Sequence, residues 1–131
     1  MREKSSIVSD LRNLALDRRA VSLMREDLSC IDSDMKKALP RIQREALERE
    51  KESLLSGMAA TEHHISRVER LLSQLTPEER KVLEGMLISP YPGVVFDLAT
   101  ELGCESSRIY RVRSRALNKL IRLRYGAGAE D

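Results

Sequence analysis

Apolar residues recur at spacings of three and four near the C-terminal end of the chain, which predicts a helix with one buried stripe over residues 106–124. The predicted stripe consists of Ile109, Val112, Ala116, Leu120 and Leu123, widened by Leu117 and Ile121. A shorter apolar pattern over residues 94–102 ends at Gly103, and glycine readily takes the left-handed conformation that follows a helix. The pattern predicts two helices joined by a tight turn.

Two longer apolar patterns occupy the first half of the chain. Between residues 7 and 39, apolar side chains recur every seven residues at Ile7, Leu14, Val21, Leu28 and Met35. Between residues 41 and 75 the spacing alternates between four and three, through Leu54, Met58, Thr61, Ile65, Val68, Leu72 and Leu75. Pro40 should stop or kink the helix, because proline lacks an amide donor. Two long helices joined at a proline predict a coiled-coil-like hairpin, and pairing between two chains remains equally open.

A third helix is predicted to start at Thr76-Pro77-Glu78-Glu79. Thr76 can cap the helix, Pro77 fits its first position, and Glu79 completes a capping box with Thr76. This helix should extend to about Ile88, with Val82 and Met86 on its inner face and Leu83 and Leu87 as further candidates for that face. Residues 89–93 should form a loop because of their prolines and glycine.

The predicted fold class is therefore all-α, with a long N-terminal helical hairpin followed by a C-terminal helix-turn-helix domain. The expected division is a coiled-coil-like region at residues 1–75, a helix-turn-helix domain at residues 76–125 and a flexible tail at residues 126–131. An aromatic content of only 3% and a charged content of 34% agree with a helical rather than a sheet-rich chain.

Charge is distributed unevenly along the chain. The formal net charge is only +2, from 23 Lys+Arg against 21 Asp+Glu, yet the predicted last helix contains seven basic residues and no acid. These basic residues are Arg108, Arg111, Arg113, Arg115, Lys119, Arg122 and Arg124. An ordinary solvated arginine face would give the same pattern. The preceding helix, glycine and turn favour a helix that enters the major groove of double-stranded DNA.

Residues 75–123 resemble region 4 of bacterial sigma factors. The matching segments are Leu75-Thr76-Pro77-Glu78-Glu79-Arg80-Lys81-Val82-Leu83, Asp97-Leu98-Ala99-Thr100-Glu101-Leu102-Gly103, Arg108-Ile109-Tyr110 and Arg115-Ala116-Leu117-Asn118-Lys119-Leu120. With two long helices in front, the organisation resembles small phage or prophage transcriptional regulators of the ArpU and RinA type. The resemblance implies a DNA-binding regulator of transcription, with RNA polymerase as a further partner.

The resemblance aligns the start of the family's recognition helix with residues 106–111, and its later basic positions with Arg115 and Lys119. Together with the exposed face of the pattern, it predicts DNA contacts from Ser106, Ser107, Arg108, Tyr110, Arg111, Ser114, Arg115 and Lys119. Two departures bear on docking: Glu105 stands where the family usually has a Ser or Thr cap, and residues 90–95 replace a glycine-rich turn and a polar helix start.

Other functions have less support in the residues. His63 and His64 point about 100° apart on a helix, and no ligand partner stands at a metal-site spacing. Neither Cys30 nor Cys104 has a histidine partner in the sequence that would indicate a nucleophile. We therefore expect no enzyme, no metal and no cofactor.

The remaining expectations concern location and partners. No apolar run is long enough for a signal peptide or a membrane span, and the two cysteines do not form a CxxC motif. These features predict a cytoplasmic protein with no membrane partner, and the resemblance implies a bacterial, nucleoid-associated location. The long helices are available for a homodimer. The rival function is a coiled-coil adaptor that binds a protein, such as RNA polymerase, without DNA specificity.

Overall fold

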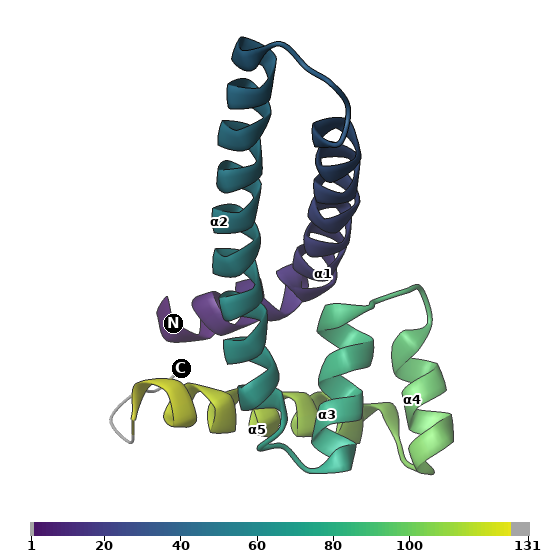
Figure 1. Ribbon diagram of the computed structural model, residues 1–131. Helices are drawn as coiled ribbons and strands as arrows, with labels where there is room; N and C mark the ends of the chain where they lie inside the picture. The colour runs from purple at the N-terminus through teal and green to yellow at the C-terminus, as the bar shows by residue number, and fades with distance from the viewer. Residues whose placement is uncertain (1, 127–131) are drawn as a thin grey trace. The chain divides into compact units, whose positions relative to one another are not determined.

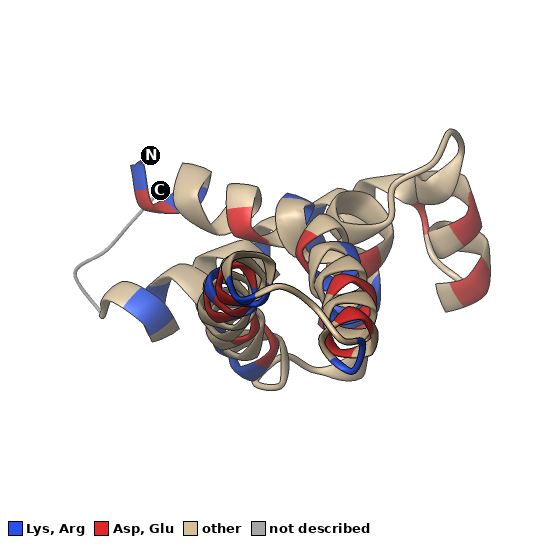
Figure 2. Cartoon of the chain, turned by 45° about the horizontal axis from the view of Figure 1, so that its top comes forward, with Lys and Arg blue, Asp and Glu red and all other residues tan. Residues whose placement is uncertain are grey.

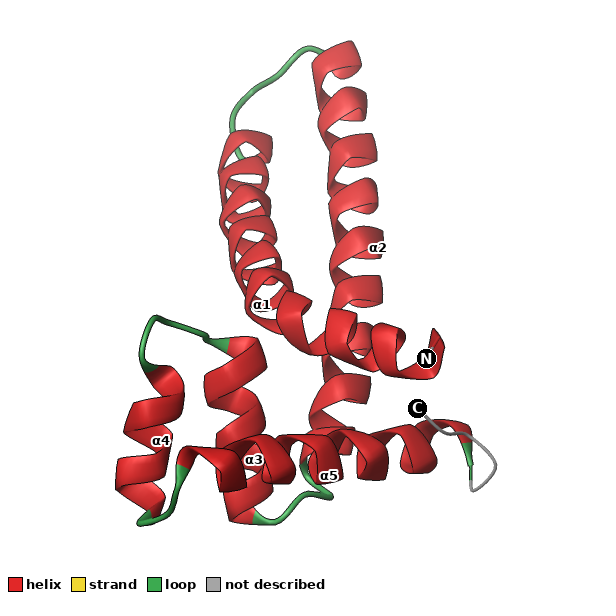
Figure 3. Cartoon of the chain, turned by 180° about the vertical axis from the view of Figure 1, so that it is seen from behind, coloured by secondary structure: helices red, strands yellow, loops and turns green. Residues whose placement is uncertain are grey.

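The structure, a computed structural model, describes residues 2–126 and is all-α, as predicted (Figure 1). Its elements are α1 (Arg2–Met35), α2 (Arg41–Leu72), α3 (Pro77–Leu83), the π-helical turn η1 (Glu84–Ile88), α4 (Val94–Leu102) and α5 (Ser106–Tyr125). No strand occurs within residues 2–126, and helices joined by short loops account for that whole range (Figure 3).

The chain divides into two compact units. Among the described residues, unit 1 comprises residues 2–15 and 67–126, and unit 2 comprises residues 16–66. This division cuts across the predicted boundary at residue 75, because the start of α1 and the end of α2 belong with α3, η1, α4 and α5. Of the predicted tail at residues 126–131, only Gly126 lies within the described residues.

In unit 2, α1 and α2 run side by side in opposite directions and are joined by residues 36–40 (Figure 1). Polar contacts cross between them: Arg25 pairs with Glu62 at 2.9 Å, and Lys51 pairs with Asp32 at 2.7 Å. The apolar side chains of this unit differ in how far they are buried. On α1, Val21 and Ile31 are buried, whereas the α2 positions of the predicted seam in this unit are only half-buried, namely Leu54, Met58, Thr61 and Ile65.

In unit 1, α5 packs against both α3 and α4. A cluster of buried side chains joins the three helices, consisting of Val82, Leu98, Ala99, Ile109 and Val112. Further buried side chains come from the beginning of α1 and the end of α2, namely Ile7, Leu11, Leu14, Val68 and Leu72. The buried side of α5 is thereby fixed, and its other side is left for solvent.

Two glycines explain the local geometry around α4. Gly103 has a φ of 64°, and the turn is closed by hydrogen bonds from the backbone N–H of Cys104 to the Ala99 carbonyl and from that of Gly103 to the Thr100 carbonyl. These two bonds form a Schellman motif, which ends α4 and lets α5 begin three residues later. At Gly85, a Cβ atom would lie 3.1 Å from Cδ1 of Leu98, so the glycine allows η1 and α4 to approach closely.

The predicted buried stripe of α5 is right except at its last member. Ile109, Val112, Ala116, Leu117, Leu120 and Ile121 are all buried. Leu123 was expected to be buried, but it is 49% exposed. Leu123 lines two surface hollows, and within residues 2–126 no neighbouring helix covers it fully. In η1, Met86 is only half-buried, while Leu87 and Ile88 are buried.

Leu120 and Leu123 offer a matched test of this correction. We expect Leu120→Ala to lower the free energy of unfolding by about 2–5 kcal/mol, because it leaves a cavity at a fully buried site. Leu123→Ala should cost less than about 1 kcal/mol, because its side chain is already half in water. Urea denaturation followed by circular dichroism measures both values, and equal losses would contradict the exposed position of Leu123.

Candidate nucleic-acid interface

The side of α5 that faces away from the core presents one continuous exposed stripe. Its members recur at spacings of four and three, so they share one helix face: Ser107, Arg111, Ser114, Asn118 and Arg122. None of them is apolar, and two are cationic. This composition suits contacts with phosphates and with base edges.

The eight residues predicted to contact DNA all belong to α5. Seven of them are exposed, namely Ser106, Ser107, Arg108, Tyr110, Arg111, Ser114 and Arg115, and Lys119 is half-buried. Ser107, Arg111 and Ser114 lie on the exposed stripe. Arg108, Arg115 and Lys119 form a second row along the edge of α5 that approaches α3.

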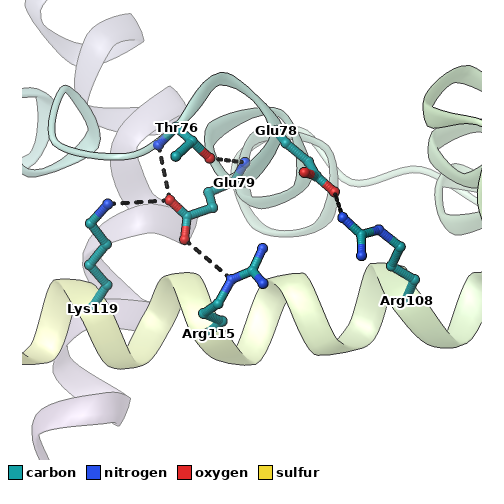
Figure 4. A network of polar contacts seen from close by, with 6 residues as sticks. All are labelled: Thr76, Glu78, Glu79, Arg108, Arg115 and Lys119. Carbon is teal, nitrogen blue, oxygen red and sulfur yellow. Dashed lines mark hydrogen bonds and ion pairs between the residues drawn. The ribbon is translucent and has the colours of Figure 1, made fainter.

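Ion pairs hold this second row against the start of α3 (Figure 4). Nη2 of Arg108 lies 2.9 Å from Oε1 of Glu78. Nε of Arg115 lies 3.7 Å from Oε2 of Glu79, and Nζ of Lys119 lies 3.4 Å from Oε1 of the same carboxylate. Three of the cations predicted to contact DNA therefore also neutralise acids of their own chain. The capping-box pattern had indicated only the role of Glu79 at the helix start.

Glu79 is the buried end of this network, with 4% of its surface exposed. The Thr76 N–H donates to its carboxylate at 3.0 Å, and the Glu79 N–H donates to the Thr76 hydroxyl at 3.2 Å, which confirms the predicted capping box. Burial raises the pKa of Glu79, but the hydrogen bonds with Thr76 and Lys119 outweigh this effect and leave the pKa below its ordinary value. The carboxylate is thus held in its charged form.

Arg111 differs from its neighbours in the second row. Its side chain is exposed, and within residues 2–126 it makes no ion pair or hydrogen bond. The same holds for Arg122 at the other end of the exposed stripe. Because an unpaired surface guanidinium keeps all its donors available, these two side chains can accept an anionic partner without breaking an internal contact.

Acidic residues lie in the turn before α5 and in α4, the helix that precedes this turn. Glu105 occupies the N-cap position of α5 with an extended backbone, and its side chain makes no capping hydrogen bond. Helix α4 contains two acids and no base, as Figure 2 shows along its length. Asp97 accepts a hydrogen bond from the Tyr91 hydroxyl at 2.7 Å, and Glu101 pairs with Lys81. The acids around this turn therefore lie on α4 and at Glu105, whereas Arg111 and Arg122, unpaired within residues 2–126, lie on α5.

Other kinds of site leave no trace in the part of the chain that the structure describes. Within residues 2–126, no three His, Cys, Asp or Glu side chains are grouped as metal ligands would be. None of the helices in that range has the length and apolar character needed to cross a membrane. Cys30 and Cys104 are both free thiols.

Comparisons with known proteins give no neighbour from which a role could be transferred. No protein-family model matches the sequence, and neither a curated protein nor a solved structure matches it.

The Glu79 network predicts a pH-dependent stability. Because its folded pKa lies below that of the unfolded chain, charged Glu79 stabilises the fold above the unfolded pKa of about 4.3, and this contribution is lost as pH falls through the folded pKa. We expect Glu79→Gln to cost about 1 kcal/mol at pH 7 and less at pH 3. Denaturant unfolding at a series of pH values measures the difference.

Glu101→Gln is the matched control for this experiment, because it removes the same charge from an exposed ion pair with Lys81. Its cost should stay below about 1 kcal/mol at pH 7. A Glu79→Gln variant whose deficit does not shrink on acidification would show that the charge of the carboxylate is unimportant.

Proposed function

We propose that the chain binds double-stranded DNA with α4, the turn at residues 103–105 and α5 acting as a helix-turn-helix, and that it regulates transcription. The observation that supports this proposal is the exposed stripe of α5, in which Arg111 and Arg122 have no partner within residues 2–126 and polar side chains lie between them. The resemblance to sigma factor region 4 motivates the regulatory role and adds RNA polymerase as a partner.

The dimensions of α5 suit a recognition helix. Its 20 residues span about 30 Å, whereas the major groove is about 12 Å wide and 8.5 Å deep. Only part of the helix can therefore lie in the groove, and in helix-turn-helix proteins this is the N-terminal part. In our proposal Ser107, Arg111 and Ser114 face the base edges, with Arg111 able to donate two hydrogen bonds to a guanine.

The second row, whose cations pair with acids of α3, has a different role in this proposal. On docking, a phosphate group would replace Glu78 as the partner of Arg108, and because exposed ion pairs contribute only about 0–1 kcal/mol the exchange costs little. Arg115 and Lys119 are needed by buried Glu79, so their loss would disturb the fold as well as any DNA contact. Arg111 is consequently the residue whose substitution tests binding alone.

The test is fluorescence anisotropy of the protein on duplex DNA at low and near-physiological salt. The wild type should bind with an affinity that falls steeply with salt, because displaced counterions drive the association. On a selected target site, Arg111→Ala should cost about 1–3 kcal/mol, which is roughly fivefold to more than a hundredfold in affinity, and relax specificity at one base pair.

Arg113→Ala is the matched control, since Arg113 lies on the same helix but is half-buried and outside the exposed stripe. It should leave affinity within about threefold of the wild type. Absence of wild-type binding at low salt would overturn the DNA proposal and favour the rival function, an adaptor that binds a folded protein.

We further propose that unit 2 is a coiled-coil-like hairpin through which two copies associate. On α1, Leu16 and Leu23 are seven residues apart, share one face, and are 65% and 48% exposed. Because a pair of helices alone leaves the apolar seam of α2 half-buried, a second copy would cover apolar surface that one chain exposes.

This association predicts a dimer in sedimentation velocity or in size-exclusion chromatography with light scattering. We expect the double change Leu16→Glu, Leu23→Glu to give a monomer, because two buried carboxylates would face each other across the interface. Ser53→Glu together with Ser56→Glu adds the same charge at exposed positions of α2 and should leave the dimer intact. A monomeric wild type at micromolar concentration would rule out this mode of association.

A further inference from the structure

Two surface hollows adjoin at Leu123 near the end of α5. One is lined from α2 and the residues just after it by Arg67, Arg70, Leu71 and Gln74, and from α5 by Leu123 and Arg124. The other is lined by Arg115, Lys119, Arg122 and Leu123 of α5. We call the combined area, with half-exposed Leu123 between its two parts, the α2–α5 surface.

The charge of the α2–α5 surface is of one sign. In the part of the chain that the structure describes, its lining contains six cationic residues and no acid. Three of the six are balanced by acids outside the lining, since Arg124 pairs with Asp10, and Arg115 and Lys119 pair with Glu79. The side chains of Arg67, Arg70 and Arg122 have no ion pair or hydrogen bond within residues 2–126. Like charges gathered without a counterion favour a polyanionic partner.

The acidic character of α4 gives this surface a specific role. In helix-turn-helix complexes the helix before the recognition helix usually crosses the DNA backbone. Here that helix is α4, which has Asp97 and Glu101 and no cation to offer a phosphate. The backbone contacts that position a reading helix must then come from other elements of unit 1.

We propose that the α2–α5 surface binds the phosphate backbone of the duplex beside the major groove into which α5 inserts. This inference rests on the proposed function of α5. Arg67 and Arg70 then hold the DNA from α2, a helix outside the helix-turn-helix, and Arg122 holds it from the far end of α5.

Distances along α5 support this placement. Arg122 follows Arg111 by eleven residues, which is about 16 Å along an α-helix. Helix-turn-helix proteins contact base edges with the N-terminal residues of the recognition helix, so docking through Arg111 leaves Arg122 beyond the base contacts, within reach of the phosphates. Gln74 adds a neutral amide donor to the same surface. Leu123 and Leu71 lie between these polar groups, where apolar sugar atoms of the backbone can pack.

The experiment compares the wild type with arginine variants in how their affinity for a mixed 24-base-pair duplex depends on salt. Dissociation constants are measured by anisotropy at several salt concentrations. Each phosphate contact contributes about 0.9 to the slope of log affinity against log salt. Arg67→Ala together with Arg70→Ala should therefore reduce the slope by about two, equally on all sequences, while the base preference set by Arg111 stays unchanged. Arg122→Ala, on the other helix, should reduce it by about one.

The matched control is Arg19→Ala together with Arg49→Ala, which removes the same charge from exposed positions of unit 2. Its slope should equal that of the wild type, and circular dichroism should show all variants folded. The three other outcomes are distinct. No binding by the wild type overturns the proposed function itself. Wild-type binding with an unchanged slope in the Arg67, Arg70 and Arg122 variants overturns only the role of the α2–α5 surface. An equal loss in the control shows a general charge effect and also overturns it.

Discussion

A single buried carboxylate links the start of α3 to α5, beside the apolar packing that joins the two helices. Glu79 closes the capping box with Thr76 and at the same time receives Arg115 and Lys119 from α5. A buried charge is tolerated only when it is paired and hydrogen-bonded, so each of these partners is required for the others to stay in place. Arg115 and Lys119 of α5 therefore stabilise the fold without any binding partner. They also connect the beginning of α3 to the helix that we propose reads DNA.

Five of the seven cations of α5 fall into two groups on this basis. Arg108, Arg115 and Lys119 face acids of α3, whereas Arg111 and Arg122 face solvent. A count of basic residues cannot make this distinction, since all of them contribute equally to the charge of the helix. The distinction decides which side chains are free for a phosphate or a base and which are held within the fold.

Sequence reasoning predicted the elements of the fold well, because their signals are local. Thr76, Pro77 and Glu79 mark the start of α3, and Gly103 marks the end of α4. It failed where the outcome depends on distant segments. The apolar spacing of α5 places Leu123 on the core side, yet whether a neighbour covers it depends on where α2 ends. The same holds for the ion pairs of Arg108 and Lys119, which join residues 30 and 40 positions apart.

The turn between α4 and α5 is closed by backbone atoms alone, through the carbonyls of Ala99 and Thr100 and the positive φ of Gly103. Arg111 and Ser114 take no part in that turn, in the core cluster or in the Glu79 network, and Ser107 contacts the turn only through a 3.5 Å hydrogen bond from its hydroxyl to the Glu105 carboxylate. The residues that set the orientation of α5 are therefore different from the residues that form its exposed stripe. Such a division allows the side chains of the exposed stripe to change one at a time while the scaffold stays the same.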